Sequence, residues 1–224
     1  ILVSGFPSLL QQYGLNQIES IKTLFGLYSI LGIGVIIAYL MLTKEIETKE
    51  SVARPLRQTL SPKSKLIVGK LCGLFAIDSF AGGFVIQSVV SLWFFTKFGA
   101  DLTTLSYIFS IAGVLTAFSF IVATKLADRI GLINTMVFTH IPSNILLIFV
   151  GFAPTLPLAI GFYLARMALS QMDVPTRQAY IVTVVNEDER TPAAGITNVS
   201  RNIAQAISPS LTGYILQSLP SLAA

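Results

Sequence analysis

The chain has 224 residues, and its 15 lysines and arginines against 11 aspartates and glutamates give a formal net charge of +4. Charged residues make up 12% of the chain, about half the roughly 25% that is usual in soluble domains, while hydrophobic residues make up 53%. These proportions exclude a water-soluble protein, because too few polar side chains remain to cover its surface. The lone cysteine, Cys72, excludes an intramolecular disulfide and a cysteine-based zinc site within the chain.

The hydrophobic residues gather into six segments of the length that crosses a bilayer. A hydrocarbon core of about 30 Å needs about 20 mostly apolar helical residues. Continuous apolar runs favour helices over the alternating pattern of a membrane barrel. We therefore predict an all-α polytopic membrane protein with six transmembrane helices, at approximately 21–42, 67–96, 103–124, 132–151, 158–174 and 191–216. The second segment is long for one crossing, and the short fifth segment is expected to continue past Pro175.

The connector 43–65 and the distribution of basic residues indicate how the chain is arranged across the membrane. The connector is rich in charge and carries Pro55 and Pro62, as a solvated linker does. Basic residues concentrate in the cytoplasmic loops of membrane proteins, and here eleven flank three connectors on one side against two on the other. We predict an extracellular segment with the first helix in 1–42, a central cytoplasmic linker in 43–65, and a bundle of five helices in 66–224. The eleven are Lys44, Lys49, Arg54, Arg57, Lys63, Lys65, Lys70, Lys125, Arg129, Arg177 and Arg190.

The positive net charge is therefore interpreted as a topology signal. The aromatic residues that base stacking would need lie inside the apolar segments instead of alternating with the basic residues. We expect a multi-pass protein of the cell membrane, plasma or inner, whose surroundings are the lipid bilayer, and no nucleic acid as a partner.

The connector after the third segment carries Asp128, Arg129 and Gly131. This string resembles the cytoplasmic loop motif of major facilitator superfamily transporters, Gly-x-x-x-Asp-Arg/Lys-x-Gly-Arg/Lys-Arg/Lys. The match is partial, because Thr124 replaces the first glycine and positions 132 and 133 are apolar. Taken alone, Asp-Arg-x-Gly is also a frequent tight turn. The resemblance implies that these three residues form a gating loop. A carboxylate close to a helix N-terminus is stabilised by ~0.3–1 kcal/mol, which is a suitable size for a reversible latch between the two halves of a transporter.

Two further features agree with this resemblance. The long basic connector precedes the motif by two segments, where the family joins its two six-helix halves, and 175–195 is similar to the stretch that joins the fourth and fifth helices of a half. In that register the six segments are the family's sixth to eleventh helices. The resemblance implies secondary transport of a small-molecule substrate by alternating access, as a permease or an efflux protein, coupled to H⁺ and without a cofactor. The resemblance also implies that the missing first-half helices of the same polypeptide complete the transporter.

Ionisable residues inside the segments are the main candidates for a site, because each costs roughly 2.5–3.5 kcal/mol at a helix centre. Asp78, Arg166 and Arg201 qualify. Asp78 and Arg201 lie ten or eleven residues from the same end of their segments, or about 15–17 Å deep. We expect them to pair across a water-filled cavity, the alternative being a static ion pair that locks two helices together. The resemblance also implies a comparison of Arg166 with an arginine that the family associates with proton coupling.

Polar side chains form a stripe on the sixth segment. Asn198, Arg201, Asn202 and Gln205 follow the spacing i, i+3, i+4, i+7, which places them on one helix face. A stripe facing lipid would be too costly, so it faces a cavity or, alternatively, makes only contacts between helices. Gln87 in the second segment is a further candidate for the substrate pathway.

Catalysis has little support in the sequence, so we predict that the protein is not an enzyme. With one histidine and one cysteine, no metal site is expected. His140 is interpreted as a buried hydrogen-bonded or interfacial histidine in preference to a proton relay. The alternative function is a stand-alone six-helix channel or membrane scaffold.

Overall fold

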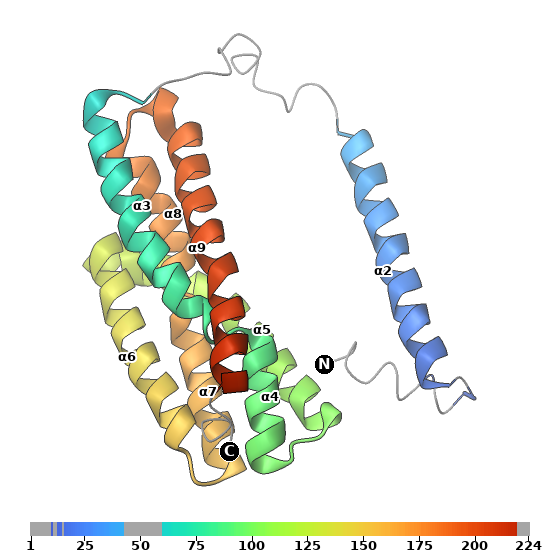
Figure 1. Cartoon of the computed structure of the whole chain (residues 1–224). Coiled ribbons are helices and arrows are strands. Elements are labelled where there is room, and N and C mark those ends of the chain that lie inside the picture. The colour runs from blue at the N-terminus through green and yellow to red at the C-terminus, as the bar shows by residue number, and fades with distance from the viewer. Residues whose placement is uncertain (1–9, 11–12, 15, 43–59, 219–224) are drawn as a thin grey trace. The chain divides into compact units, whose positions relative to one another are not determined.

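The computed structural model describes residues 10, 13–14, 16–42 and 60–218, and every regular element in these ranges is helical (Figure 1). The chain divides into two compact units, Ile1–Gln58 and Thr59–Ala224, each described by itself. Most of the predicted linker, residues 43–59, lies outside the described residues.

The described part of the first unit is built on one long helix, α2 (Gln17–Leu40). A reciprocal capping box fixes its start: the Asn16 side chain accepts from the backbone N–H of Glu19 at 2.9 Å, and the Glu19 carboxylate accepts from the backbone N–H of Asn16 at 3.0 Å. Its Ile18–Leu40 stretch is long and apolar enough to cross a membrane, in agreement with the first predicted span.

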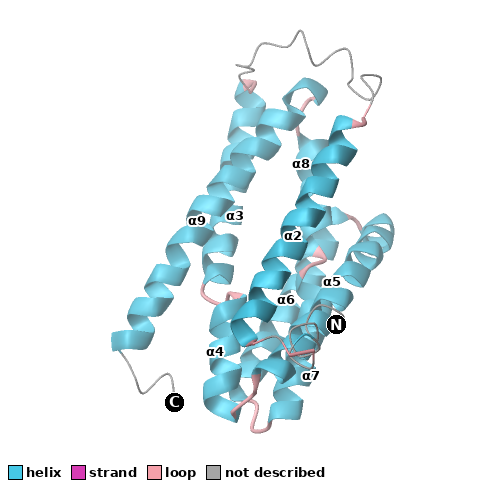
Figure 2. Ribbon diagram, turned by 90° about the vertical axis from the view of Figure 1, so that its right-hand side faces the viewer, coloured by secondary structure: helices cyan, strands magenta, loops and turns pink. Residues whose placement is uncertain are grey.

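The second unit is a bundle of helices that run up and down past one another (Figures 1 and 2). Helix α3 packs along α9, and α6 packs along α7. The helices are α3 (Pro62–Gly83), α4 (Gln87–Phe98), α5 (Leu102–Ile130), α6 (Leu132–Phe152), α7 (Leu156–Ser170), α8 (Asp173–Val184), the 3₁₀ turn η3 (Glu187–Glu189) and α9 (Arg190–Ser218).

Two of the predicted spans are broken helices. The fifth continues past Pro175, as expected, but is interrupted between α7 and α8 because Pro175 has no N–H to give the carbonyl of Gln171 and its ring crowds that carbonyl. The second is interrupted between α3 and α4, directly after Gly82 and Gly83. A Cβ at Gly83 would lie 2.6 Å from Cβ of Ser208, so this glycine also allows α3 and α9 to approach closely.

Four described helical stretches are long and apolar enough to cross a membrane, Ile18–Leu40, Pro62–Phe98, Leu102–Ile130 and Leu132–Phe152. They correspond to the first four predicted spans. The fifth predicted span consists of α7 and α8, of 15 and 12 residues, and the sixth is α9, of 29 residues. Helix α9 is long enough, but its polar stripe makes it less apolar than the other four.

The buried residues form two hydrophobic clusters at different heights in the bundle. The larger joins α4, α5, α6 and α7 around the fully buried Phe94, whose ring lies 5.9 Å from that of Tyr163 in a T-shaped arrangement. Phe109 packs on Tyr163 in the same way, also at 5.9 Å. We call Trp93, Phe94, Phe98, Phe109 and Tyr163 the aromatic cluster. The smaller hydrophobic cluster joins α3, α8 and α9 around Val68, Leu71 and Ile181.

Candidate functional site

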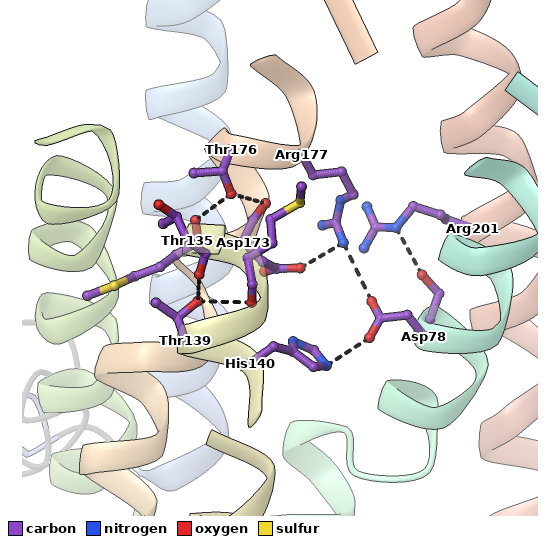
Figure 3. A network of polar contacts seen from close by, with 11 residues as sticks. Asp78, Thr135, Thr139, His140, Asp173, Thr176, Arg177 and Arg201 are labelled. Atoms are coloured by element: carbon purple, nitrogen blue, oxygen red, sulfur yellow. Dashed lines mark hydrogen bonds and ion pairs between the residues drawn. The ribbon is translucent and has the colours of Figure 1, made fainter. Parts of the chain in front are cut away.

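Charged side chains from four helices converge between the two hydrophobic clusters (Figure 3). They are Asp78 of α3, His140 of α6, Asp173 and Arg177 of α8, and Arg201 of α9, and we call these five residues the polar network. His140 lies eight residues after the start of α6, or about 12 Å along a helix of about 31 Å. The network therefore lies well away from both ends of α6.

Asp78 is the centre of the polar network. Its Oδ1 lies 3.0 Å from Nε2 of His140, and its Oδ2 lies 3.5 Å from Nη1 of Arg177. The side chains of Asp78 and His140 are 33% and 37% exposed. One carboxylate thus links α3 to both α6 and α8, and about a third of its side chain remains exposed.

Arg177 and Asp173 form the buried part of the polar network. Nη1 of Arg177 donates to Oδ2 of Asp173 at 2.8 Å, across one turn of α8. The guanidinium also lies over the ring of Phe75, with Cζ 5.4 Å from the ring centroid, and Arg177 is only 3% exposed. Such a buried ion pair is compensated only when each charge keeps its partner.

Arg201 approaches the network from α9. Its Nε donates to Oγ of Ser79 at 2.9 Å, and Ser79 follows Asp78 in the sequence. Figure 3 shows the guanidinium of Arg201 beside that of Arg177, which is directed at Asp173 and Asp78. The expected pairing of Asp78 with Arg201 is thus indirect in this structure: the two residues share a site, but Asp78 contacts His140 and Arg177 instead.

Comparison with known proteins identifies the family of this chain. The family described as Major Facilitator Superfamily matches residues 72–221, which is more than half of the chain and contains the whole polar network. The chain belongs to the major facilitator superfamily. The resemblance inferred from the loop motif is therefore confirmed, and the candidate spans agree with a multi-pass membrane protein of this family.

A curated relative agrees with this assignment. The chain is 24% identical to the "Uncharacterized membrane protein YJR124C" of Saccharomyces cerevisiae over 96% of its own length. It spans about half, 55%, of that relative's length. No solved structure matches the chain significantly.

The major facilitator loop motif lies where α5 passes into α6. Asp128 and Arg129 are exposed in the last turn of α5, and Gly131 forms the single-residue junction with φ 88° and ψ 159°. Only glycine adopts this conformation readily, so the motif's glycine has a backbone reason for its position. The latch function of the other two residues stays a prediction.

The remaining candidates lie outside the polar network's direct contacts. Asn198, Asn202 and Gln205 are exposed on α9, next to the face that packs on α3, and Gln87 is exposed at the start of α4. Arg166 is half-buried on α7, and its Nε is fully buried without a hydrogen-bond partner in the described part of the chain. Of the predicted pathway residues, the structure brings Asp78 and Arg201 together and leaves Arg166 and Gln87 apart from them.

Sequence reasoning missed three members of the polar network. Arg177 was counted among the basic residues of a connector, but α8 extends to Val184 and buries it. Asp173 was overlooked, although its i, i+4 spacing with Arg177 next to apolar segments was a usable signal. His140 is indeed hydrogen-bonded, yet it faces the bundle's charged centre through Asp78.

A carboxylate outside both the polar network and the membrane-spanning segments holds the starts of two helices together. Glu189 of η3, 4% exposed, accepts from the backbone N–H of Ser61, from Oγ of Ser64 at 2.5 Å and from Nδ2 of Asn186 at 2.9 Å. These hydrogen bonds, with that of Ser64 the largest contribution, lower the pKa of Glu189 from 4.5 to about 2. Glu189 therefore stays ionised and holds the start of α3 against the start of α9.

Proposed function

We propose that this chain belongs to a secondary active transporter that moves a small solute by alternating access and couples its movement to protons. The observation that carries the proposal is Asp78, a partly exposed carboxylate inside an apolar bundle that contacts His140 of α6 and Arg177 of α8. Charged side chains at such positions are costly in a membrane and mark substrate or ion pathways.

The two broken helices support a binding site at this level. Asp78 lies in α3 shortly before the α3–α4 break, and Asp173 lies directly after the α7–α8 break. Transporters commonly form their substrate and ion sites from discontinuous helices near the bilayer midplane. The polar network is therefore the favoured position for the transported solute.

A proton on Asp78 would change how the helices are connected. The ionised carboxylate attracts both His140 and Arg177, so its neutralisation weakens the links from α3 to α6 and from α3 to α8. This gives proton binding a direct effect on helix contacts, which is what coupling to a conformational change requires.

We propose the cell membrane, plasma or inner, as the location, and the basic connectors support an orientation with the 43–65 linker in the cytoplasm. Moving Arg177 into α8 leaves ten basic residues on that side against two on the other, so the charge asymmetry persists. An epitope placed in the linker and probed with antibody in intact and permeabilised cells tests this orientation; staining of intact cells would contradict it.

The transport proposal is tested by Asp78→Asn in proteoliposomes. The substrate is first found as the compound that raises the protein's melting temperature in detergent, and its labelled form is then followed under an imposed pH gradient. Wild type is expected to accumulate the solute above its outside concentration. Asp78→Asn is expected to abolish accumulation while the protein inserts and folds normally.

Asp188→Asn is the matched control, because Asp188 is an exposed carboxylate on η3 outside the polar network. It should accumulate solute like wild type. Wild-type accumulation by Asp78→Asn would refute the role of Asp78. Flux that only dissipates gradients, never building one, would favour the channel alternative.

A further inference from the structure

The arginines inside the bundle outnumber the aspartates. Arg166, Arg177 and Arg201 lie within its helices, against Asp78 and Asp173. Arginine keeps its proton in proteins, so the positive charge cannot be removed by titration. Among the described residues of the bundle interior, one positive charge therefore remains unmatched when His140 is neutral.

Arg201 is the arginine of the polar network whose positive charge is open to a ligand. Arg177 is buried against Asp173, whereas Arg201 is partly exposed. Within residues 60–218, the hydrogen bond of Arg201 is the one from Nε to the neutral Ser79, and no acceptor lies on its two terminal nitrogens. No carboxylate in that range lies within 4.0 Å of Arg201, so its terminal N–H groups are available to an anion.

The surroundings of Arg201 extend this site along α9. Asn198, Asn202 and Gln205 share its helix face, within an arc of about 100°, and all three are exposed. The adjoining face, with Thr197 and Ser208 fully buried, packs on α3. The three amide residues therefore border the helix contact, and within residues 60–218 their exposed side chains are available to bind the neutral polar groups of a solute.

We propose that the transported solute is a small organic anion and that Arg201 binds its carboxylate or phosphate group. This inference rests on the proposed transport function and adds the class of substrate. The planar guanidinium of Arg201 presents paired N–H groups that match both oxyanions. At Arg201 a cation would be repelled by the guanidinium, while the carboxylates of Asp78 and Asp173 already contact Arg177.

The proposal is tested by ligand binding to the full-length protein in detergent, measured as the concentration-dependent rise in melting temperature. The probes are succinate and glycerol 3-phosphate, their uncharged counterparts succinamide and glycerol, and the dication putrescine. One of the two anions is expected to stabilise wild type with saturation, and which one does so separates carboxylate from phosphate recognition. The uncharged compounds and putrescine are expected to have no effect.

Variants then locate the anion. Arg201→Gln is expected to weaken apparent anion binding by about 10- to 100-fold, the usual range for losing a hydrogen bond to a charged group. Arg201→Lys keeps the charge without the paired N–H groups and should bind about tenfold more weakly. Arg190→Gln removes an exposed arginine on the rim of the bundle and should leave binding unchanged.

The possible outcomes separate this proposal from the transport function. Stabilisation by succinamide, glycerol or putrescine, no stabilisation by either anion, or wild-type anion affinity in Arg201→Gln would overturn the anion site. If Arg201→Gln does not fold, wild-type affinity in Arg201→Lys overturns it instead. Anion binding without gradient-driven uptake would contradict transport alone, and gradient-driven uptake of an uncharged probe would contradict the anion site alone.

Discussion

The aromatic cluster and the polar network lie in one bundle, yet different forces hold them. In the aromatic cluster, Phe94 is completely buried and meets Tyr163 ring to ring, and the cavity beside them, of about 180 Å³, is lined by apolar side chains. In the polar network, charges are paired through Asp78, and about a third of that side chain remains exposed. The two helix breaks separate these regions, since α3 and α8 carry the network while α4 and α7 carry the aromatic rings.

This division indicates which part of the bundle is built to stay closed. Apolar packing inside a bilayer depends on close contact between surfaces, because lipid is as apolar as the protein. A charged network can rearrange when a solute or a proton takes the place of one of its partners, because no buried charge is then left unpaired. The aromatic cluster is therefore expected to act as a rigid base, and the network as the part that rearranges.

The largest effect on stability is expected from breaking the network at its buried pair. Arg177→Met leaves Asp173 buried without its partner, which should lower the free energy of unfolding by about 3–5 kcal/mol. Unfolding by SDS in mixed micelles, followed by circular dichroism, measures the change.

Arg190→Met is the matched control for Arg177→Met. Its guanidinium lies 3.6 Å from the carboxylate of Glu187 in an exposed pair, so the loss should be at most about 0.5 kcal/mol. Equal effects of the two substitutions would show that the buried network is not stabilised by its pairing. Adding Asp173→Leu to Arg177→Met should recover part of the loss, because no unpaired charge remains at that pair.

The aromatic cluster is tested by Phe94→Ala. Removing a fully buried ring leaves a cavity between α4 and α7, and the loss should be about 3 kcal/mol. The neighbouring Phe95 is 59% exposed, so Phe95→Ala should change stability by less than about 0.5 kcal/mol. A Phe94 variant that remains folded should also retain solute binding. Loss of solute binding in that variant would show that the aromatic cluster and the polar network are coupled.

The two regions also differ in how far the sequence predicted them. The helices of both were predictable, because a run of about 20 apolar residues is a local signal. The continuation of α7 into α8 beyond Pro175 followed from the length of the span. Asp78 and Arg201 were found because a charge inside an apolar run is itself conspicuous.

The partners within the network could not be found in this way. The contact between His140 and Asp78 joins residues 62 positions apart, and it depends on how α6 lies against α3. Arg177 was misplaced because charge and a nearby proline suggested a connector, whereas the apolar residues that follow it extend α8. Local patterns predict the helices, but contacts between helices depend on packing that one sequence does not display.

A smaller effect is expected at the close contact of α3 with α9. In Gly83→Ala the added Cβ would meet the side chain of Ser208 at 2.6 Å and the carbonyl of Gln205 at 3.0 Å, so the helices must separate. The expected loss is about 1–3 kcal/mol. Gly82→Ala has nothing within 4 Å of its new Cβ and should be neutral or slightly stabilising. Equal losses would attribute the effect to helix propensity instead of packing.

The smallest expected effect concerns Glu189 and appears as pH dependence. The pKa of Glu189 is lowered from 4.5 to about 2 by folding, so its contribution to stability is complete above about pH 4.5 and is lost as the pH falls toward 2. Melting temperatures in detergent between pH 6 and pH 3 measure this. Glu189→Gln should melt below wild type at pH 6, and the difference should narrow toward pH 3.

Glu187→Gln is the control for Glu189→Gln, because Glu187 is an exposed carboxylate on the same 3₁₀ turn, with 87% of its side chain accessible. Its melting curve should follow wild type at every pH. Parallel curves for wild type and Glu189→Gln would mean that the Glu189 carboxylate does not hold α3 to α9. If the difference in melting temperature narrows toward pH 3, the ionised Glu189 holds α3 to α9. This contact at the rim of the bundle is then one that stays paired, unlike the polar network, which is expected to rearrange.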